Sequence, residues 1–226
     1  MRDRQRCRRG TDCAEAAPGR RSQQTCAPRT VSEVIWLLLV PAYLLGTFPN
    51  AAIVARSRGI DIQQVGSGNP GASNVARVMG TKWGVVVFIL DGLKGAIPAG
   101  VGLLLDNRAA AYGMLFAAVI GHMYPITRRF RGGKGVATMG GGALVLQPVV
   151  SLGLLVLWVV VRKLSGKASL ASLAIMVGLP IAVAIKGTPG WEVAALVACN
   201  ALVLLRHVDN IKRLIAGREL SASHTS

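Results

Sequence analysis

The chain has 226 residues, of which 52% are hydrophobic and 16% are charged, and this composition favours a membrane protein. The formal net charge of +16 does not indicate nucleic-acid binding, because the basic residues lie in short loops between apolar runs. Such loops are typical of cytoplasmic membrane faces and anionic lipid headgroups. No segment is long and polar enough to form a soluble domain that reads bases.

Residues 1–30 differ from the rest of the chain, since they contain eight arginines, three acidic residues and no apolar run. We expect a basic, disordered extension here. A second hypothesis is that part of it is not translated and that synthesis begins near Val31. Three of the four cysteines lie in this extension, but without the CxxC spacing or the neighbouring histidine of a zinc site.

Six apolar segments follow in chain order. The first, 31–55, is long enough to span a hydrocarbon core of about 30 Å and too long for the apolar core of a secretory signal. The other five are 83–105, 109–126, 143–161, 168–185 and 191–205. The sequence therefore predicts an all-α fold, a polytopic transmembrane helical bundle over residues 31–220, with a short tail over 221–226.

Three polar clusters interrupt the apolar sequence, at 65–80, 121–142 and 206–219. Two apolar segments separate the first cluster from the second, which returns both to the same membrane face. Three segments separate the second from the third, so a shared face requires a hidden helix or a segment that does not cross. Pro148 and Pro180 favour broken or re-entrant helices as the explanation.

Positive charge in all three clusters predicts that they share the cytoplasmic face. The same count of crossings then predicts an N-terminus outside the cell. The arginine-rich extension conflicts with that orientation, and this conflict is a further reason to question the extension.

The pair Asp91 and Lys94 lies inside an apolar segment. Ionisable groups at membrane depth are costly and normally face a partner or a wet cavity. Two interpretations stay open: a functional pair at the site, or a structural ion pair at i,i+3 on one helix face.

The first polar cluster, VGSGNPGASNVARVMG, is rich in small residues that let backbone N–H groups approach an anion, and Arg77 adds a planar charge suited to phosphate. Its glycines at 66, 68 and 71 match the dinucleotide fingerprint, but no strand precedes them, so a Rossmann site is excluded. The GGKG run beginning at Gly132 likewise lacks the remaining residues of a nucleotide P-loop.

The second cluster combines this glycine run with four cations, Arg128, Arg129, Arg131 and Lys134. It fits a phosphate-binding loop, although an ordinary positive-inside loop stays open as the alternative. In the third cluster His207 and Asn210 share one helix face. Such a pair can orient a hydroxyl group, or the histidine can simply cap a helix.

Taken together, SGNPGASNVARVMG, GHMYPITRRFRGGKGVAT and RHVDNIKRLIAGRE resemble the three motifs of the bacterial membrane acyltransferases that move an acyl chain from acyl-phosphate to glycerol 3-phosphate. The resemblance covers roughly residues 31–220. Ser73 stands where threonine is usual, and Arg131 where lysine is common. The family implies about seven transmembrane helices, some short or broken, an outside N-terminus and a cytoplasmic active site in the bacterial cell membrane.

The resemblance implies glycerol 3-phosphate and acyl-phosphate as substrates, lysophosphatidate as product and membrane lipids as surroundings, with no cofactor or metal. The catalytic group would be Ser67, His207 and Asn210, which would position the glycerol phosphate and its 1-hydroxyl. The substrate-binding group would be Arg77, Lys134, Lys94, Asn69, Asn74, Gly132, Gly133 and Arg213. Asp91 would hold Lys94, and Glu219 would anchor the last helix.

Two alternatives stay open at this point. Ser67 could act as a nucleophile and form an acyl-enzyme in place of direct transfer. The chain could also be a transporter or channel for an anionic metabolite, although no second copy of SGNPGASN or GGKGVAT indicates duplicated halves. The sequence leaves the oligomeric state open.

Overall fold

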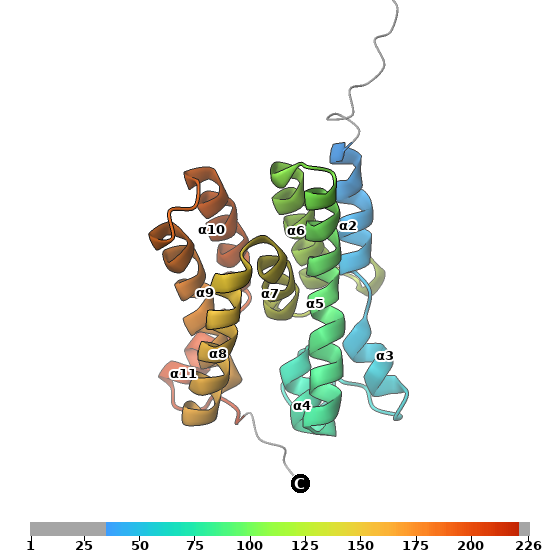
Figure 1. The fold of residues 1–226 in the computed structure, drawn as a ribbon. Helices are drawn as coiled ribbons and strands as arrows, with labels where there is room; N and C mark the ends of the chain where they lie inside the picture. Colours follow the sequence, from blue (N-terminus) through green and yellow to red (C-terminus); the bar gives the residue numbers. More distant parts are fainter. Residues whose placement is uncertain (1–34, 222–226) are drawn as a thin grey trace, which may run out of the picture.

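The structure is a computed structural model that describes residues 35–221. The expectations for residues 1–30, including the start of translation, lie outside the described residues. Within them the secondary structure is entirely helical, as Figure 1 shows. The α-helices are α2 (Leu39–Gly46), α3 (Asn50–Arg56), α4 (Ala72–Met79), α5 (Thr81–Leu104), α6 (Arg108–Met123), α7 (Val136–Leu146), α8 (Pro148–Ser165), α9 (Ala168–Ile185), α10 (Gly190–Leu205) and α11 (Val208–Ile215). Two short 3₁₀ turns, Trp36–Leu38 and Ile126–Arg128, complete the order.

Five stretches among the described residues are long and apolar enough to cross a membrane: Trp36–Arg56, Thr81–Leu104, Arg108–Arg128, Pro148–Ser165 and Ala168–Ile185. Helices α10 and α11 form a sixth candidate that is bent by 60° between them. Helix α7 is a shorter apolar helix. The fold is therefore the expected all-α polytopic bundle, with about seven apolar segments of which some are short or broken.

Helix α7 is the segment that the count of six apolar runs missed. The predicted segment 143–161 is in fact the end of α7 and most of α8, with a break at Gln147. Pro148 occupies the first turn of α8, where its missing N–H needs no partner. The expectation of a break at Pro180 is wrong, because α9 continues through it, as prolines allow in membrane helices whose neighbours support the backbone.

Glycine residues let α7 pack very closely against α5. A Cβ atom at Gly95 would overlap the carbonyl oxygen of Thr138, and one at Gly141 would overlap the carbonyl oxygen of Gly92. In a lipid environment, close backbone approach through small residues is a main source of helix association. Helix α7 also contacts α6 and α8, so it lies between the α2, α5, α6 group and the α8, α9, α10 group (Figure 1).

A buried polar network lies at the end of the bundle where α6 and α10 begin, opposite α4 and α11 (Figure 1). The Glu192 carboxylate accepts hydrogen bonds from Arg108 at 2.9 and 2.6 Å and from the Tyr112 hydroxyl at 2.6 Å. Gln147 donates to Glu192 at 3.2 Å and accepts from Lys186 at 2.9 Å. The network therefore ties α6 and α10 to the break between α7 and α8.

Candidate active site

The loop before α4 is shaped by Asn74. Its side-chain oxygen accepts a hydrogen bond from the backbone N–H of Ser67 at 2.8 Å, and its amide donates to the carbonyl oxygens of Ile62 and Val65 at 3.1 and 3.0 Å. Gly66 has φ of +62°, a left-handed conformation that suits glycine. Asn74 thus holds Ser67 in a fixed position just before α4 begins.

Arg77 lies on the same short helix as Asn74 and is largely buried. Its guanidinium donates to the Asn74 side-chain oxygen at 3.2 Å and to the Ser221 carbonyl oxygen at 2.8 Å. Burial lowers the pKa of Arg77 from its usual value, and Arg213 adds to that effect against an opposing contribution from Glu219. The side chain stays a guanidinium cation at physiological pH.

The loop before α7 packs directly against the C-terminal end of α6. The backbone N–H groups of Gly132 and Gly133 donate to the carbonyl oxygens of Met123 and His122 at 3.2 and 3.1 Å. A Cβ atom at Gly133 would overlap the His122 ring, so only glycine fits there. These contacts fix Lys134, the next residue, at the start of α7.

Two positions in the third cluster have well-defined hydrogen bonds. The Nδ1 of His207 lies 2.8 Å from the carbonyl oxygen of Val203, so Nδ1 carries the proton and Nε2 is the acceptor of the neutral ring. Burial lowers the pKa of His207 to about 4, which keeps the ring neutral at physiological pH. Asn210 accepts a hydrogen bond from Lys134 and donates to Glu219 at 2.6 Å.

Glu219 is the acidic residue of this group. Its carboxylate accepts from Ser169 at 2.8 Å and from Arg213 at 2.9 Å, besides Asn210. Burial would raise its pKa, but the hydrogen bonds from these three residues outweigh burial and lower it. Glu219 therefore stays ionised and joins α11 to the start of α9.

Lys134 has a strongly altered pKa. Burial, the largest cause, and the neighbouring cations Arg213, Arg206 and Arg77 together lower it to about 8, against an opposing contribution from Glu219. Cations thus outnumber anions around this side chain. An additional anion bound beside Lys134 would relieve that repulsion.

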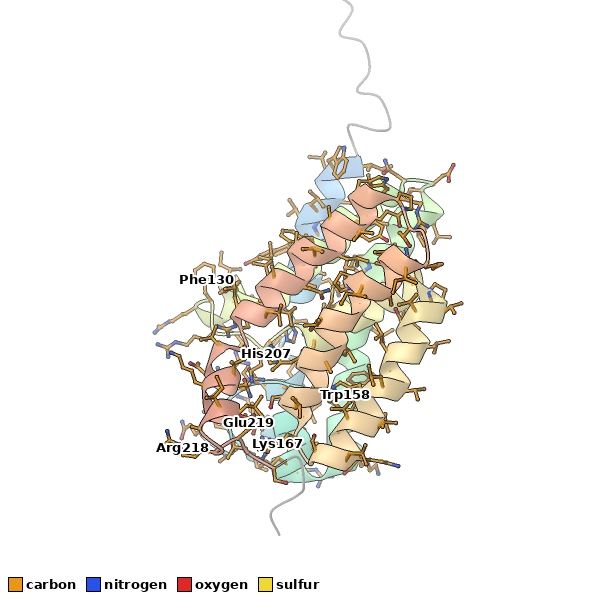
Figure 2. The ribbon with its side chains drawn as sticks, turned by 90° about the vertical axis from the view of Figure 1, so that its left-hand side faces the viewer. Phe130, Trp158, Lys167, His207, Arg218 and Glu219 are labelled. Carbon is orange, nitrogen blue, oxygen red and sulfur yellow. The ribbon has the colours of Figure 1, made fainter. Side chains whose placement is uncertain are left out.

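A single cavity of about 370 Å³ is lined by residues of all three polar clusters, with Lys134 as the cation from the second. Seven of the predicted site residues line it: Ser67, Asn69, Asn74, Arg77, Lys134, His207 and Asn210. Its remaining walls are mainly apolar and come from α5, α7, α8 and α9, with Phe88, Leu93, Leu144, Leu155, Trp158 and Ile175 among them. Three of the lining residues, His207, Glu219 and Trp158, lie in the same half of the bundle (Figure 2).

Four predicted substrate-binding residues lie outside this cavity. Lys94 is buried behind it, with its ammonium 2.8 Å from Asp91, and Asn50 donates to the same carboxylate at 3.0 Å. Because a buried charge needs a partner, Lys94 pairs within the protein. Gly132 and Gly133 line a much smaller neighbouring pocket together with Lys94.

Arg213, the fourth of these residues, forms an ion pair with Glu219 at 2.9 Å. Although Arg213 does not line the cavity, its positive charge lowers the pKa of Lys134, which does.

Arg206 is a site residue that the sequence interpretation missed. Its guanidinium donates to the carbonyl oxygens of Gly132 and Gly133 at 3.1 and 3.4 Å and stacks over the Tyr124 ring at 5.4 Å. It therefore connects the glycine loop to the end of α10, where His207 follows. The only hint of this role in the sequence is the position of Arg206 next to His207. No local pattern reveals its contact with Gly132, which is 74 positions away.

These features define a polytopic helical membrane protein with one amphipathic cavity, cationic at one end and apolar along the rest. The chain belongs to the glycerol-3-phosphate acyltransferase family, since the model of the family described as "Glycerol-3-phosphate acyltransferase" matches residues 36–217. It is an acyltransferase. This confirms the resemblance inferred from the three motifs, and the transporter interpretation is set aside.

Individual relatives agree with this assignment. A glycerol-3-phosphate acyltransferase of Aquifex aeolicus is 39% identical over 185 residues, covering 80% of this chain and 96% of the relative. One from Rubrobacter xylanophilus is 40% identical over 189 residues, covering 81% of this chain and 92% of the relative.

Two solved structures are also similar. One is described as PlsY, an integral membrane glycerol 3-phosphate acyltransferase, in its glycerol 3-phosphate form; it has a TM-score of 0.80 and 37% identity, and the match covers 83% of this chain and 95% of that one. The other is the lysophosphatidic acid form, with a TM-score of 0.78 and 36% identity over the same shares.

Proposed function

We propose that the protein transfers an acyl chain from acyl-phosphate to the 1-hydroxyl of glycerol 3-phosphate and so makes lysophosphatidate. The observation that carries this proposal is the single cavity in which Arg77, Lys134 and His207 adjoin a long apolar wall. Such a cavity suits a donor with a charged head and an apolar chain. The names of the relatives and the two forms of the similar structure support the acceptor and the product.

The polar end of the cavity offers several groups to phosphate. Lys134 and Arg77 supply positive charge, and α7 begins at the cavity with Gly135 and Val136 in its lining. A helix N-terminus favours an anion through its unpaired N–H groups. Reaction joins two phosphate-bearing molecules, so neutralising their mutual repulsion is the main electrostatic task of the site.

His207 supports the assignment of the reacting hydroxyl. Its neutral ring presents Nε2 as an acceptor, because Nδ1 donates to Val203. The glycerol hydroxyl would donate to Nε2 while its oxygen attacks the acyl carbon. The bond from that carbon to the phosphate oxygen then breaks, and the proton ends on the departing phosphate. Acyl-phosphate is already activated, so positioning and charge neutralisation account for most of the catalysis.

Direct transfer is favoured over an acyl-enzyme on Ser67. A serine nucleophile needs a base within hydrogen-bond reach. Among the described residues, the hydrogen bond recorded for the Ser67 hydroxyl comes from the backbone N–H of Asn69 at 3.4 Å, and no histidine or carboxylate pairs with it. We therefore assign Ser67 to holding the glycerol phosphate, together with Asn69 and Asn74 in the same loop.

We also propose that the cavity faces the cytoplasm of a bacterial cell. The end of the bundle that carries α4 and α11 also carries Arg56, Lys82 and Lys163 at helix ends, which fits the excess of positive charge on cytoplasmic loops. Helix α2, the first α-helix of the described residues, lies toward the opposite end (Figure 1). The enzymatic unit would be residues 31–220, in keeping with the family match.

The proposal is tested with purified protein in lipid nanodiscs supplied with hexadecanoyl phosphate and labelled glycerol 3-phosphate. We expect labelled lysophosphatidate and free phosphate in equal amounts. A second arm supplies hexadecanoyl-coenzyme A, and product from that donor alone would overturn the choice of acyl-phosphate. Absence of product with both donors would overturn the function.

A third arm omits the acceptor and measures the intact mass of the protein. An added acyl group would indicate the Ser67 route. An unchanged mass, with turnover intact, would support direct transfer.

A further inference from the structure

The apolar wall of the cavity includes two helices, α5 and α8, that do not pack along each other. Helix α5 packs against α4, α6 and α7, whereas α8 packs against α9 and α7. Helix α8 has no buried side chain, which sets it apart from the other membrane-length helices. One face of α8 therefore borders the cavity, and the bilayer covers the other.

One aromatic pair bridges these two helices. The rings of Phe88 on α5 and Trp158 on α8 stack with centroids 6.4 Å apart and an angle of 24° between their planes. Both residues line the cavity, and Phe88 is 36% exposed. The stack therefore connects α5 and α8 through side chains, whereas the main helix packing of both runs through other helices.

Trp158 is held on its own side of this space. Its indole N–H donates to the Ser172 hydroxyl on α9 at 3.2 Å, and the Arg162 guanidinium lies over the ring at 5.4 Å. Figure 2 shows Trp158 at about the height of His207 and Glu219. The stack thus lies beside the polar end of the cavity, where the acyl carbon would react.

We propose that Phe88 and Trp158 form a gate through which the acyl chain moves sideways between the bilayer and the cavity. The inference rests on the proposed function, since it needs a substrate and a product that carry a long chain. Exposing such a chain to water is unfavourable, so a route that stays within apolar surroundings is preferred. A stack of two rings can open by side-chain rotation, whereas two interlocked helices cannot.

Other side chains support this route. Close to the stack along the two helices, Val85 and Ile89 on α5 and Leu155 and Val159 on α8 are exposed apolar residues. Ile89 and Leu155 also line the cavity. Apolar surface around the stack is therefore continuous between the exterior of the bundle and the cavity lining.

The test locks the gate with a reducible crosslink. In a variant whose native cysteines are replaced (Cys199 by alanine, and Cys7, Cys13 and Cys26 by serine), Phe88→Cys and Trp158→Cys are joined by a short bis-thiosulfonate reagent. When the empty enzyme is crosslinked, we expect loss of at least 90% of turnover with hexadecanoyl phosphate and recovery on reduction. When the enzyme is first loaded with donor, glycerol 3-phosphate should give about one product per enzyme.

Sustained turnover in the crosslinked state would overturn the proposed gate. Complete loss of product from the preloaded enzyme would also overturn it, because that result would indicate that the crosslink damages the site itself. The control joins α2 to α6 through Leu39→Cys and Gly113→Cys, two neighbouring positions outside the cavity lining, and should keep turnover. Activity of the reduced protein tests the proposed function separately. The test of the gate uses only the ratio of turnover between the crosslinked and the reduced enzyme.

A second measurement does not depend on crosslinking. Phe88→Ala should raise kcat/KM for a branched acyl-phosphate relative to the straight-chain donor at least threefold, because the gate becomes wider. Ile97→Ala, an exposed residue on the same helix but outside the cavity lining, should leave that ratio unchanged. Equal ratios in both variants would contradict the gate.

Discussion

Lys134 donates a hydrogen bond to the side chain of Asn210, although 76 positions separate the two residues in the chain. Asn210 in turn donates to Glu219. The glycine loop before α7 and the start of α11 therefore share one hydrogen-bonded chain. The charge of Lys134 is held at the polar end of the cavity before any substrate arrives.

Replacing Lys134 by alanine should abolish turnover while the protein stays folded in the membrane. Removal of one positioned group that stabilises charge in the transition state typically costs about 100- to 1,000-fold in rate. The measurement is kcat with hexadecanoyl phosphate, together with membrane yield. Lys163→Ala, an exposed lysine on α8, is the matched control and should keep full activity. Retained activity in both Lys134→Ala and His207→Ala would remove the site assignment.

The pH dependence of kcat/KM should report the Lys134 ammonium. Its pKa of about 8 means that the charged form dominates at pH 7 and is lost as the pH rises above 8. We therefore expect kcat/KM for glycerol 3-phosphate to fall on the alkaline side with a midpoint near pH 8. In Lys134→Arg the cation persists to much higher pH, so the alkaline fall should move upward. An unmoved profile in that variant would show that another group titrates.

Arg206 should act as a positioning residue for the glycine loop. It donates to two carbonyl oxygens, on Gly132 and Gly133, and a lysine in its place cannot reproduce both bonds in the same plane. Arg206→Lys should lower kcat/KM for glycerol 3-phosphate about tenfold, or about 1.4 kcal/mol.

The KM for glycerol 3-phosphate should account for most of the effect of Arg206→Lys, with thermal stability little changed. Arg218→Lys, at an exposed position of the same C-terminal region, is the control. Equal effects of the two variants would leave Arg206 without a special role.

Close packing of α5 on α7 predicts a strong difference between two glycines of α5. A methyl group at Gly95 would overlap the Thr138 carbonyl, whereas one at Gly100 would meet no atom within 4 Å. Overpacking typically costs about 1–3 kcal/mol. Gly95→Ala should therefore lower Tm in detergent by roughly 5 °C for a chain of this size. Gly100→Ala should leave Tm unchanged or raise it, and similar Tm values for both variants would contradict the packing argument.

The membrane-spanning helices were predictable because length and hydropathy are local properties of the chain. The segments 83–105 and 168–185 correspond closely to α5 and α9. Helix α7 was not predictable in the same way, because its GGG run at 140–142 is typical of a loop in a soluble protein. In this bundle the same glycines form a packing face, and only the contact of Gly141 with α5 reveals that.

Much of the candidate site was also visible in the sequence. Ser67, Arg77, Lys134 and His207 stood out because polar residues are rare in an apolar chain, and the structure brings them to one cavity. Contacts over long sequence distances were not visible. The i,i+3 spacing of Asp91 and Lys94 indicated a possible ion pair, which the structure shows, but nothing in the local pattern indicates that Arg206 holds the carbonyls of the glycine loop.

The buried network around Glu192 has a consequence for the membrane as a whole. Two of its members, Tyr112 and Gln147, are hydrogen-bonded to each other. Within residues 35–221, neither of them lines the cavity. Between the network and the cavity, buried apolar side chains such as Leu146, Leu196 and Val183 belong to the main core. An ion that moved from the reaction site toward the opposite side would therefore have to pass this apolar core, which is costly for a charge. The enzyme can work on highly charged molecules while the bilayer around it keeps its electrical insulation.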